Sequence, residues 1–198
     1  MSKKVKIAIN GFGRIGRAAL RIALTHPDVE AAAINDPGDT ATLAHLIKYD
    51  TVYGPLAQEV KVDGDILTIG GNKISVSHDR EPAKLPWAKL GVEVVLECTG
   101  AFKTYDEVAA HLKAGAKKVI IATEHTASDG KPKIVKKCSL PLTAKGVVDL
   151  IITELAVIKV TKRGLVLKEI VPGKTVEEIQ ALTGAKLQVA RNLKEIEI

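Results

Sequence analysis

The sequence predicts an α/β fold, a three-layer sandwich in which helices cover both faces of a mostly parallel sheet with an antiparallel extension. Short apolar runs of strand length alternate with segments of helical spacing, and glycine or polar breaks separate them. The chain has 198 residues, of which 46% are hydrophobic and 26% charged, a composition typical of a globular protein and not of a disordered one.

The first forty residues predict a strand, a turn, a helix and a second strand. Residues 5–9 alternate in hydropathy, and the strand ends at Asn10-Gly11. From Arg14 onwards apolar residues recur at helical intervals until His26-Pro27, where we expect the helix to end. Residues 29–35 form a mostly apolar run, which predicts the second strand.

A glycine pattern and an acid in this region predict a dinucleotide site. Gly11, Gly13 and Gly16 form G-x-G-x-x-G: the first permits a sharp turn, the second lets a pyrophosphate approach, and the third allows close packing of helix and strand. Free amides at the helix start favour a bound phosphate. Asp36 follows Gly16 by 36 − 16 = 20 residues, a separation typical of a carboxylate that binds the adenosine ribose. Such a carboxylate repels a 2′-phosphate, so we expect NAD and not NADP.

Residues 6–17 read Lys-Ile-Ala-Ile-Asn-Gly-Phe-Gly-Arg-Ile-Gly-Arg and resemble the start of glyceraldehyde-3-phosphate dehydrogenase, whose cofactor domain is Rossmann-like. The likeness continues at residues 33–36, 42–50, 96–100 and 114–121, and so covers residues 5–121. It implies that Asn10, Arg14 and Ile15 line the pyrophosphate and ribose. It also implies Asp36 at the adenosine ribose, Arg80 against the adenine, and Thr99 with Gly100 near the cofactor. The candidate cofactor-binding residues are therefore Asn10, Gly11, Phe12, Gly13, Arg14, Ile15, Gly16, Asp36, Arg80, Thr99 and Gly100.

For two of these candidates, Arg80 and Thr99, ordinary surface and loop roles stay open as alternatives. Further along, residues 58–76 alternate and contain two turn signals, which predicts two successive hairpin turns. Residues 92–96 and 118–122 predict core strands, residues 105–113 predict an amphipathic helix, and a packing role is expected for Trp87.

The catalytic parts of the dehydrogenase family are not found in the sequence. Its Ser-Cys-Thr-Thr-Asn segment with the nucleophile does not follow Ile121, and neither does the second domain with its histidine base. A thiolate needs such a base within reach. We expect Cys98, in Glu-Cys-Thr-Gly, to be a buried structural residue. The sequence therefore predicts no catalytic residue.

The remaining residues resemble a second family, the carboxyl-terminal part of the B subunit of 3-oxoacid CoA-transferases. The likeness is carried by residues 124–143, 145–157, 164–170 and 175–183. Residues 114–122 fit either family, which makes them a natural crossover point. The glutamate nucleophile of the transferases lies in an earlier part of their subunit that has no counterpart here, and Glu124 does not match it.

Residues 124–198 also predict regular structure. Residues 151–160 and 165–170 predict two strands, a capping-box pattern at Thr175 predicts a helix through Leu182, and residues 187–189 predict a last strand. Because this segment is small, we expect a single α/β domain over residues 1–198, in which residues 124–198 complete the sheet of the dinucleotide-binding part, residues 1–123. His125 and Cys138 match no zinc pattern, so structural or solvated roles and no metal site are expected.

Charge and composition indicate which classes of binding partner to expect. The net charge of +6 is scattered and only 3% of residues are aromatic, which argues against nucleic acid. With two cysteines, no signal-peptide pattern and no apolar run of ~18 residues, we expect a cytoplasmic protein without a membrane partner. Oligomerisation stays open.

Three functions are compatible with the sequence. The preferred hypothesis is an NAD-binding domain without complete catalytic machinery, a recombined or engineered chimera. The alternatives are a residual NAD-dependent aldehyde dehydrogenase and a purely structural recombination product that binds no cofactor.

Overall fold

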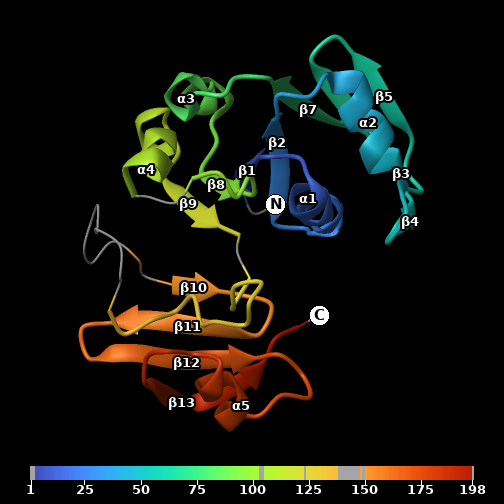
Figure 1. Ribbon diagram of the computed structural model, residues 1–198. Helices are drawn as coiled ribbons and strands as arrows, with labels where there is room; N and C mark the ends of the chain where they lie inside the picture. The colour runs from blue at the N-terminus through green and yellow to red at the C-terminus, as the bar shows by residue number, and fades with distance from the viewer. Residues whose placement is uncertain (1–2, 103–104, 123, 138–147, 149, 198) are drawn as a thin grey trace. The chain divides into compact units, whose positions relative to one another are not determined.

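The computed structural model describes residues 3–102, 105–122, 124–137, 148 and 150–197 (Figure 1). The chain divides into two compact units, Met1–Ile121 and Ala122–Ile198. No helix in the described part of the chain is both long enough and apolar enough to span a membrane.

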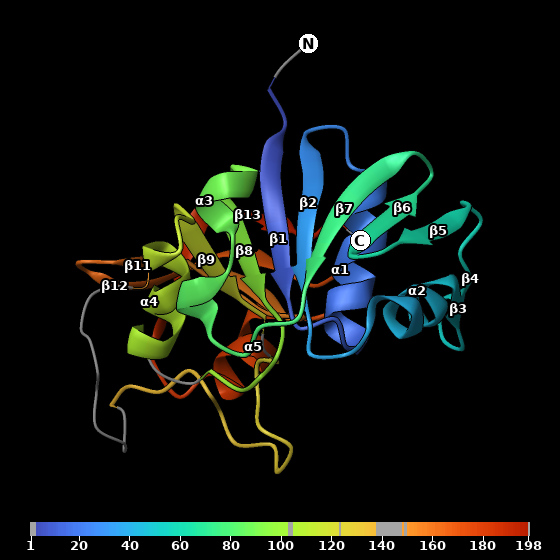
Figure 2. The same ribbon diagram turned by 90° about the horizontal axis from the view of Figure 1, so that it is seen from above.

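The first unit contains a seven-stranded sheet in the order β5-β6-β7-β2-β1-β8-β9 (Figure 2). Five strands are parallel, and the β5–β6 hairpin adds the antiparallel extension. The strands are β1 (Val5–Asn10), β2 (Val29–Asn35), β5 (Val60–Asp63), β6 (Ile66–Ile69), β7 (Asn72–Ser77), β8 (Val94–Glu97) and β9 (Lys118–Ile121). The mostly parallel α/β sheet and both hairpin turns are as the sequence predicts.

Helices cover both faces of this sheet because each carries an apolar stripe. The helices are α1 (Arg14–Thr25), α2 (Thr40–Lys48), α3 (Trp87–Leu90) and α4 (Tyr105–Lys113), and a 3-10 turn lies at Pro82–Lys84. Residues of α1 and α2 share one buried cluster with Ile9 and Ile34, whereas Trp87 and Ala114 share the other with Val95. A two-stranded ribbon follows α2, formed by β3 (Tyr49–Asp50) and β4 (Gly54–Pro55).

The second unit contains its own four-stranded sheet, β10 (Leu150–Ile152), β11 (Ala156–Thr161), β12 (Gly164–Ile170) and β13 (Leu187–Glu195). β10, β11 and β12 are antiparallel, and β13 runs parallel to β12 after the crossover helix α5 (Val176–Ala181). The predicted capping box is present: the Thr175 hydroxyl accepts from the Glu178 amide, and the Glu178 carboxylate accepts from the Thr175 amide.

One expectation about residues 124–198 needs correction. Their described strands pair with one another and add none to the seven-stranded sheet, so they do not complete it in the way the sequence suggested. The physical reason is that β11 and β12 bury Ile158 and Leu167 in a small core of their own, together with Ile179 of α5. That residues 1–198 form one domain stays a prediction.

His125 is buried in the second unit and bonded at both ring nitrogens. Nδ1 lies 2.9 Å from the Thr153 hydroxyl and Nε2 lies 2.9 Å from the Thr183 hydroxyl, which itself donates to the Ile179 carbonyl. This is the structural role predicted for His125, whereas Cys138 lies outside the described residues. Burial lowers the pKa of His125, although the Glu154 carboxylate opposes that shift.

The lowered pKa of His125 predicts acid sensitivity of this unit. The ordinary pKa of histidine is about 6.5. Below that pH His125 binds a proton in the unfolded chain but not in the folded chain, so the stability of the fold falls as the pH falls. From about pH 7 to about pH 5.5 the loss of stability attributable to His125 is at most about 1.3 kcal/mol. Urea unfolding followed at both pH values should show this loss in the wild type and not in His125→Gln. Equal losses in the two proteins would contradict the prediction.

Candidate functional site: the carboxyl edge of the parallel sheet

The turn between β1 and α1 has the geometry that the glycine pattern predicts. Gly11 has a φ of +89°, and a Cβ there would lie 2.7 Å from the Thr99 nitrogen. A Cβ on Gly16 would lie 2.1 Å from the Gly11 carbonyl oxygen, so helix and strand are in direct contact. By contrast, nothing lies within 4 Å of a Cβ on Gly13. Each glycine is needed for a different reason, and only the middle one faces open space.

The start of α1 has amides without a side-chain cap. Gly13 occupies the N-cap and no side chain bonds the first turn, which also carries no acidic residue. The positive end of the helix dipole is therefore not neutralised by any side chain of the N-cap or first turn. Arg17 donates to the Phe12 carbonyl over 3.2 Å and holds the turn in place.

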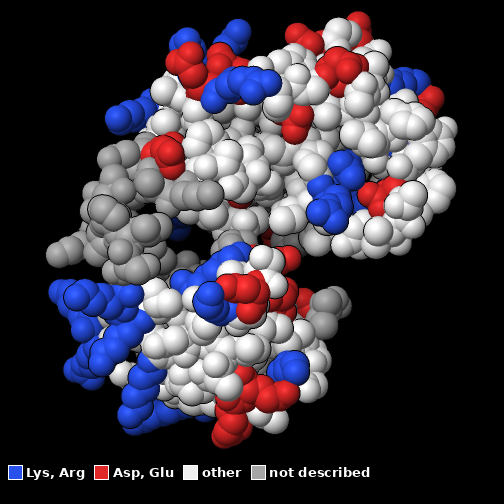
Figure 3. All heavy atoms as spheres, in the orientation of Figure 1, with Lys and Arg blue, Asp and Glu red and all other residues white. Residues whose placement is uncertain are grey.

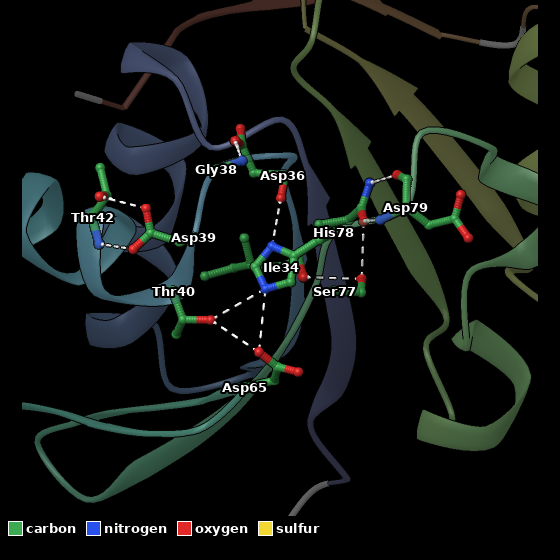
Figure 4. A network of polar contacts seen from close by, with 11 residues as sticks. Ile34, Asp36, Gly38, Asp39, Thr40, Thr42, Asp65, Ser77, His78 and Asp79 are labelled. Carbon is green, nitrogen blue, oxygen red and sulfur yellow. Dashed lines mark hydrogen bonds and ion pairs between the residues drawn. The ribbon is translucent and has the colours of Figure 1, made fainter.

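Asp36 lies next to this turn, at the carboxyl end of β2. Its Oδ2 accepts from the Phe12 amide over 2.8 Å, and its Oδ1 accepts from the Gly38 amide over 2.9 Å. Figure 4 shows the second of these bonds. Each carboxylate oxygen has a further lone pair for a ligand hydroxyl. The acid and the glycine turn, predicted separately from the sequence, thus form one constellation.

The other predicted site residues differ in whether their side chains are exposed to solvent. Arg14 and Ile15 are exposed on the first turn of α1, Arg80 is exposed after β7, and Thr99 and Gly100 are exposed after β8. Phe12 and Asn10 present no side chain at the surface, because the first packs in the core and the second is 2% exposed. Their contribution at this edge comes through backbone groups and, for Asn10, through buried hydrogen bonds.

A buried polar network below this edge was not anticipated from the sequence. The side-chain Nδ2 of Asn35 donates to Oδ1 of Asn10 over 2.7 Å, and the side-chain Nδ2 of Asn10 donates to the Glu97 carboxylate. His111 of α4 lies 3.1 Å from the same carboxylate and accepts from the Trp87 indole over 3.0 Å. The only sequence signal was an acid at the end of the apolar run of β8.

A second network joins the segment after Asp36 to the β5–β6 turn (Figure 4). His78 Nδ1 donates to the Asp36 carbonyl over 2.9 Å, and Nε2 lies 3.3 Å from both Asp65 and the Thr40 hydroxyl. Although partial burial lowers it, the bonds to the Asp36 carbonyl and to Asp65, together with the Asp65 charge, bring the pKa of His78 above its ordinary value. An open depression of about 500 Å³ lies beside these residues. The network fixes the backbone that follows Asp36.

Cys98 follows β8 and packs against the first buried cluster. Burial, with a further contribution from the Glu97 carboxylate, raises the pKa of the thiol to about 11. It is therefore a protonated thiol near neutral pH and a poor nucleophile.

Charged side chains of both signs lie over the first unit in Figure 3, whereas Lys and Arg gather at one end of the second. The sequence-based view that the positive charge is scattered therefore holds for the visible face of the first unit.

Comparison with known proteins gives matches in two overlapping segments. Residues 5–105 match the family model for the NAD binding domain of glyceraldehyde 3-phosphate dehydrogenase, and residues 82–182 match that for coenzyme A transferase. The two-family composition predicted from the sequence is confirmed. The stretch matched by both families, residues 82–105, lies upstream of residues 114–122, where the crossover was expected.

Curated relatives support the first match. The chain is 54% identical to glyceraldehyde-3-phosphate dehydrogenase 1 of Bacillus subtilis over 125 residues. The aligned segment covers 63% of this chain and 37% of that protein. It is 52% identical over 118 residues to the glyceraldehyde-3-phosphate dehydrogenase of Geobacillus stearothermophilus, 60% of this chain and 35% of that protein. The chain thus spans about a third of the length of these relatives.

Each family model covers about half of the chain, and the first covers the whole glycine turn, Asp36 and Thr99. The chain therefore belongs to the family of glyceraldehyde 3-phosphate dehydrogenase NAD binding domains, and through residues 82–182 to the coenzyme A transferase family as well.

Proposed function

We propose that this chain is an NAD-binding protein that lacks the catalytic apparatus of either family. The observation that carries the proposal is the Asp36 carboxylate, bonded to the Phe12 amide beside the uncapped start of α1. NAD requires a carboxylate that accepts hydrogen bonds from ribose hydroxyls, next to amides that donate hydrogen bonds to its pyrophosphate.

The proposed absence of catalysis rests on the residues available for it. The dehydrogenase reaction needs a thiolate, and the Cys98 thiol has its pKa raised to about 11 by burial. His111 and Glu97 are buried and bonded to each other. The Ser-Cys-Thr-Thr-Asn segment of the dehydrogenases is not in the sequence.

The two family matches support an origin by recombination. They overlap at residues 82–105, which contain α3 and β8, so two parents that share a helix and strand here can be joined without a break in the sheet. We infer a chimera of the two families, natural or engineered, with NAD as the ligand retained.

Calorimetric titration of the protein with NAD tests the proposal. We expect heat of binding, and a rise in melting temperature with NAD concentration because a ligand that binds only the folded state stabilises it. NADP should bind more weakly, since its 2′-phosphate meets the Asp36 carboxylate. No heat and no thermal shift at millimolar NAD would refute NAD binding. Formation of NADH from NAD at saturating aldehyde would refute the absence of dehydrogenase activity.

A further inference from the structure

Glu97 is a buried carboxylate that no part of the proposed site uses directly. Its side chain is 1% exposed at the end of β8. Oε1 accepts from the Thr99 amide over 2.8 Å and from the Thr99 hydroxyl, and Oε2 accepts from the Asn10 amide and from His111 Nε2. Four hydrogen-bond donors thus converge on one carboxylate. They offset the free-energy cost of burying its negative charge.

The direction of these bonds leaves His111 neutral. The Trp87 indole can only donate, so Nδ1 of His111 accepts from it over 3.0 Å and carries no proton. Nε2 therefore carries the hydrogen and donates to Glu97. Although burial raises it, the bonds from His111, Asn10 and Thr99 bring the pKa of Glu97 below its usual value. Glu97 is accordingly an anion held by neutral donors.

The carboxylate determines where Thr99 lies. Both the amide and the hydroxyl of Thr99 point to Oε1, and the same hydroxyl accepts from the Ala101 amide over 3.0 Å. Thr99 in turn abuts Gly11: a Cβ on that glycine would meet the Thr99 nitrogen, Cα and Cγ2 at 2.7, 2.8 and 2.8 Å. The segment after β8 is therefore held against the first glycine of the phosphate turn.

We propose that Glu97 is a positioning residue for the dinucleotide, because its buried carboxylate holds Thr99 against Gly11. Asp36 follows β2 and Thr99 follows β8, on opposite sides of β1, so with the adenosine ribose at Asp36 the half of NAD beyond the pyrophosphate extends toward Thr99. The inference rests on the proposed NAD site and adds to it a residue that touches no ligand. A segment fixed before binding loses less conformational freedom when the ligand arrives, which raises affinity.

The test is Glu97→Gln, which keeps the shape and removes the charge. The glutamine side chain has one oxygen, and its nitrogen is a donor. That nitrogen must therefore face other donors, either those of Thr99 or those of Asn10 and His111. We expect affinity for NAD to fall about tenfold or more. Affinity for AMP, which lacks the second half of the dinucleotide, should change less than about twofold. Glu93→Gln is the matched control, since Glu93 precedes β8 and pairs with the surface Lys117; it should bind NAD as the wild type does.

Thr99→Val separates positioning from general destabilisation. Valine has the shape of threonine and keeps the backbone amide that donates to Glu97, so this variant removes only the hydroxyl. If Glu97 acts through Thr99, the losses of NAD affinity in the two variants are not additive in the double variant. Should Glu97→Gln fail to fold, Thr99→Val alone must weaken NAD several-fold and spare AMP.

Three results overturn the inference: unchanged NAD affinity in Glu97→Gln, a parallel loss of NAD and AMP, or additive losses in the double variant. Each of them leaves the proposed function intact, because the wild type still binds NAD. A wild-type protein that binds neither nucleotide would instead refute the proposed function.

Discussion

Replacing Gly16 with alanine is expected to destabilise the first unit by about 3 kcal/mol or more. Alanine favours a helix by about 1 kcal/mol over glycine, so propensity alone predicts the opposite sign. The clash decides the outcome, because the new Cβ would lie 2.1 Å from the Gly11 carbonyl oxygen and 3.1 Å from Ile9 Cγ2. Neither the backbone oxygen nor the buried strand can move cheaply. Urea unfolding followed by far-UV circular dichroism measures the effect.

Gly13→Ala is the matched control for Gly16→Ala. Its Cβ meets nothing within 4 Å and its φ of −69° is ordinary for alanine, so the one expected cost is that of alanine in place of glycine at an N-cap, a fall of about 1 kcal/mol or less in the free energy of unfolding. NAD affinity should nevertheless fall, since the methyl group occupies space that the pyrophosphate needs. Similar stability losses in the two variants would show that the close contact at Gly16 does not exist.

Replacing Asp36 with alanine is expected to weaken NAD binding about 10- to 100-fold, the largest loss among the predicted site residues. The carboxylate supplies charged acceptors to the ribose and also holds the Phe12 and Gly38 amides. Discrimination against NADP should fall in the same variant, because the charge that repels the 2′-phosphate is gone. Calorimetric titration with both nucleotides measures the two effects.

Asp39→Asn is the control for a general effect of charge near Asp36. The Asp39 carboxylate caps α2 by accepting from the Thr42 amide and hydroxyl, bonds that hold the pKa of Asp39 below its ordinary value. Asparagine is an equally good cap, so fold and NAD affinity should be retained. An Asp36→Ala variant that binds NAD no worse than Asp39→Asn would remove the ribose assignment.

Local patterns predicted most of the first unit and part of the second. The strand, glycine turn and helix at residues 5–25, the two hairpin turns and the Thr175 capping box were all readable because each depends on residues close together in the chain. Helix α2 was not predicted, although Asp39 before an apolar pattern through Ile47 was a usable signal. The separate sheet of residues 150–195 was missed because strand propensity does not say which strands pair.

The sequence by itself determined the fold class, the glycine turn and the acid of the proposed NAD site, since these depend on spacing along a single strand-turn-helix-strand run. Only the tertiary structure decided that Glu97 is buried under the site, with Asn10, Thr99, His111 and Trp87 around it. These partners come from β1, the segment after β8, α4 and α3. A hydrogen bond between residues 87 positions apart, such as that of Asn10 and Glu97, has no periodic pattern in the sequence, and it exists only once the strands and helices have packed.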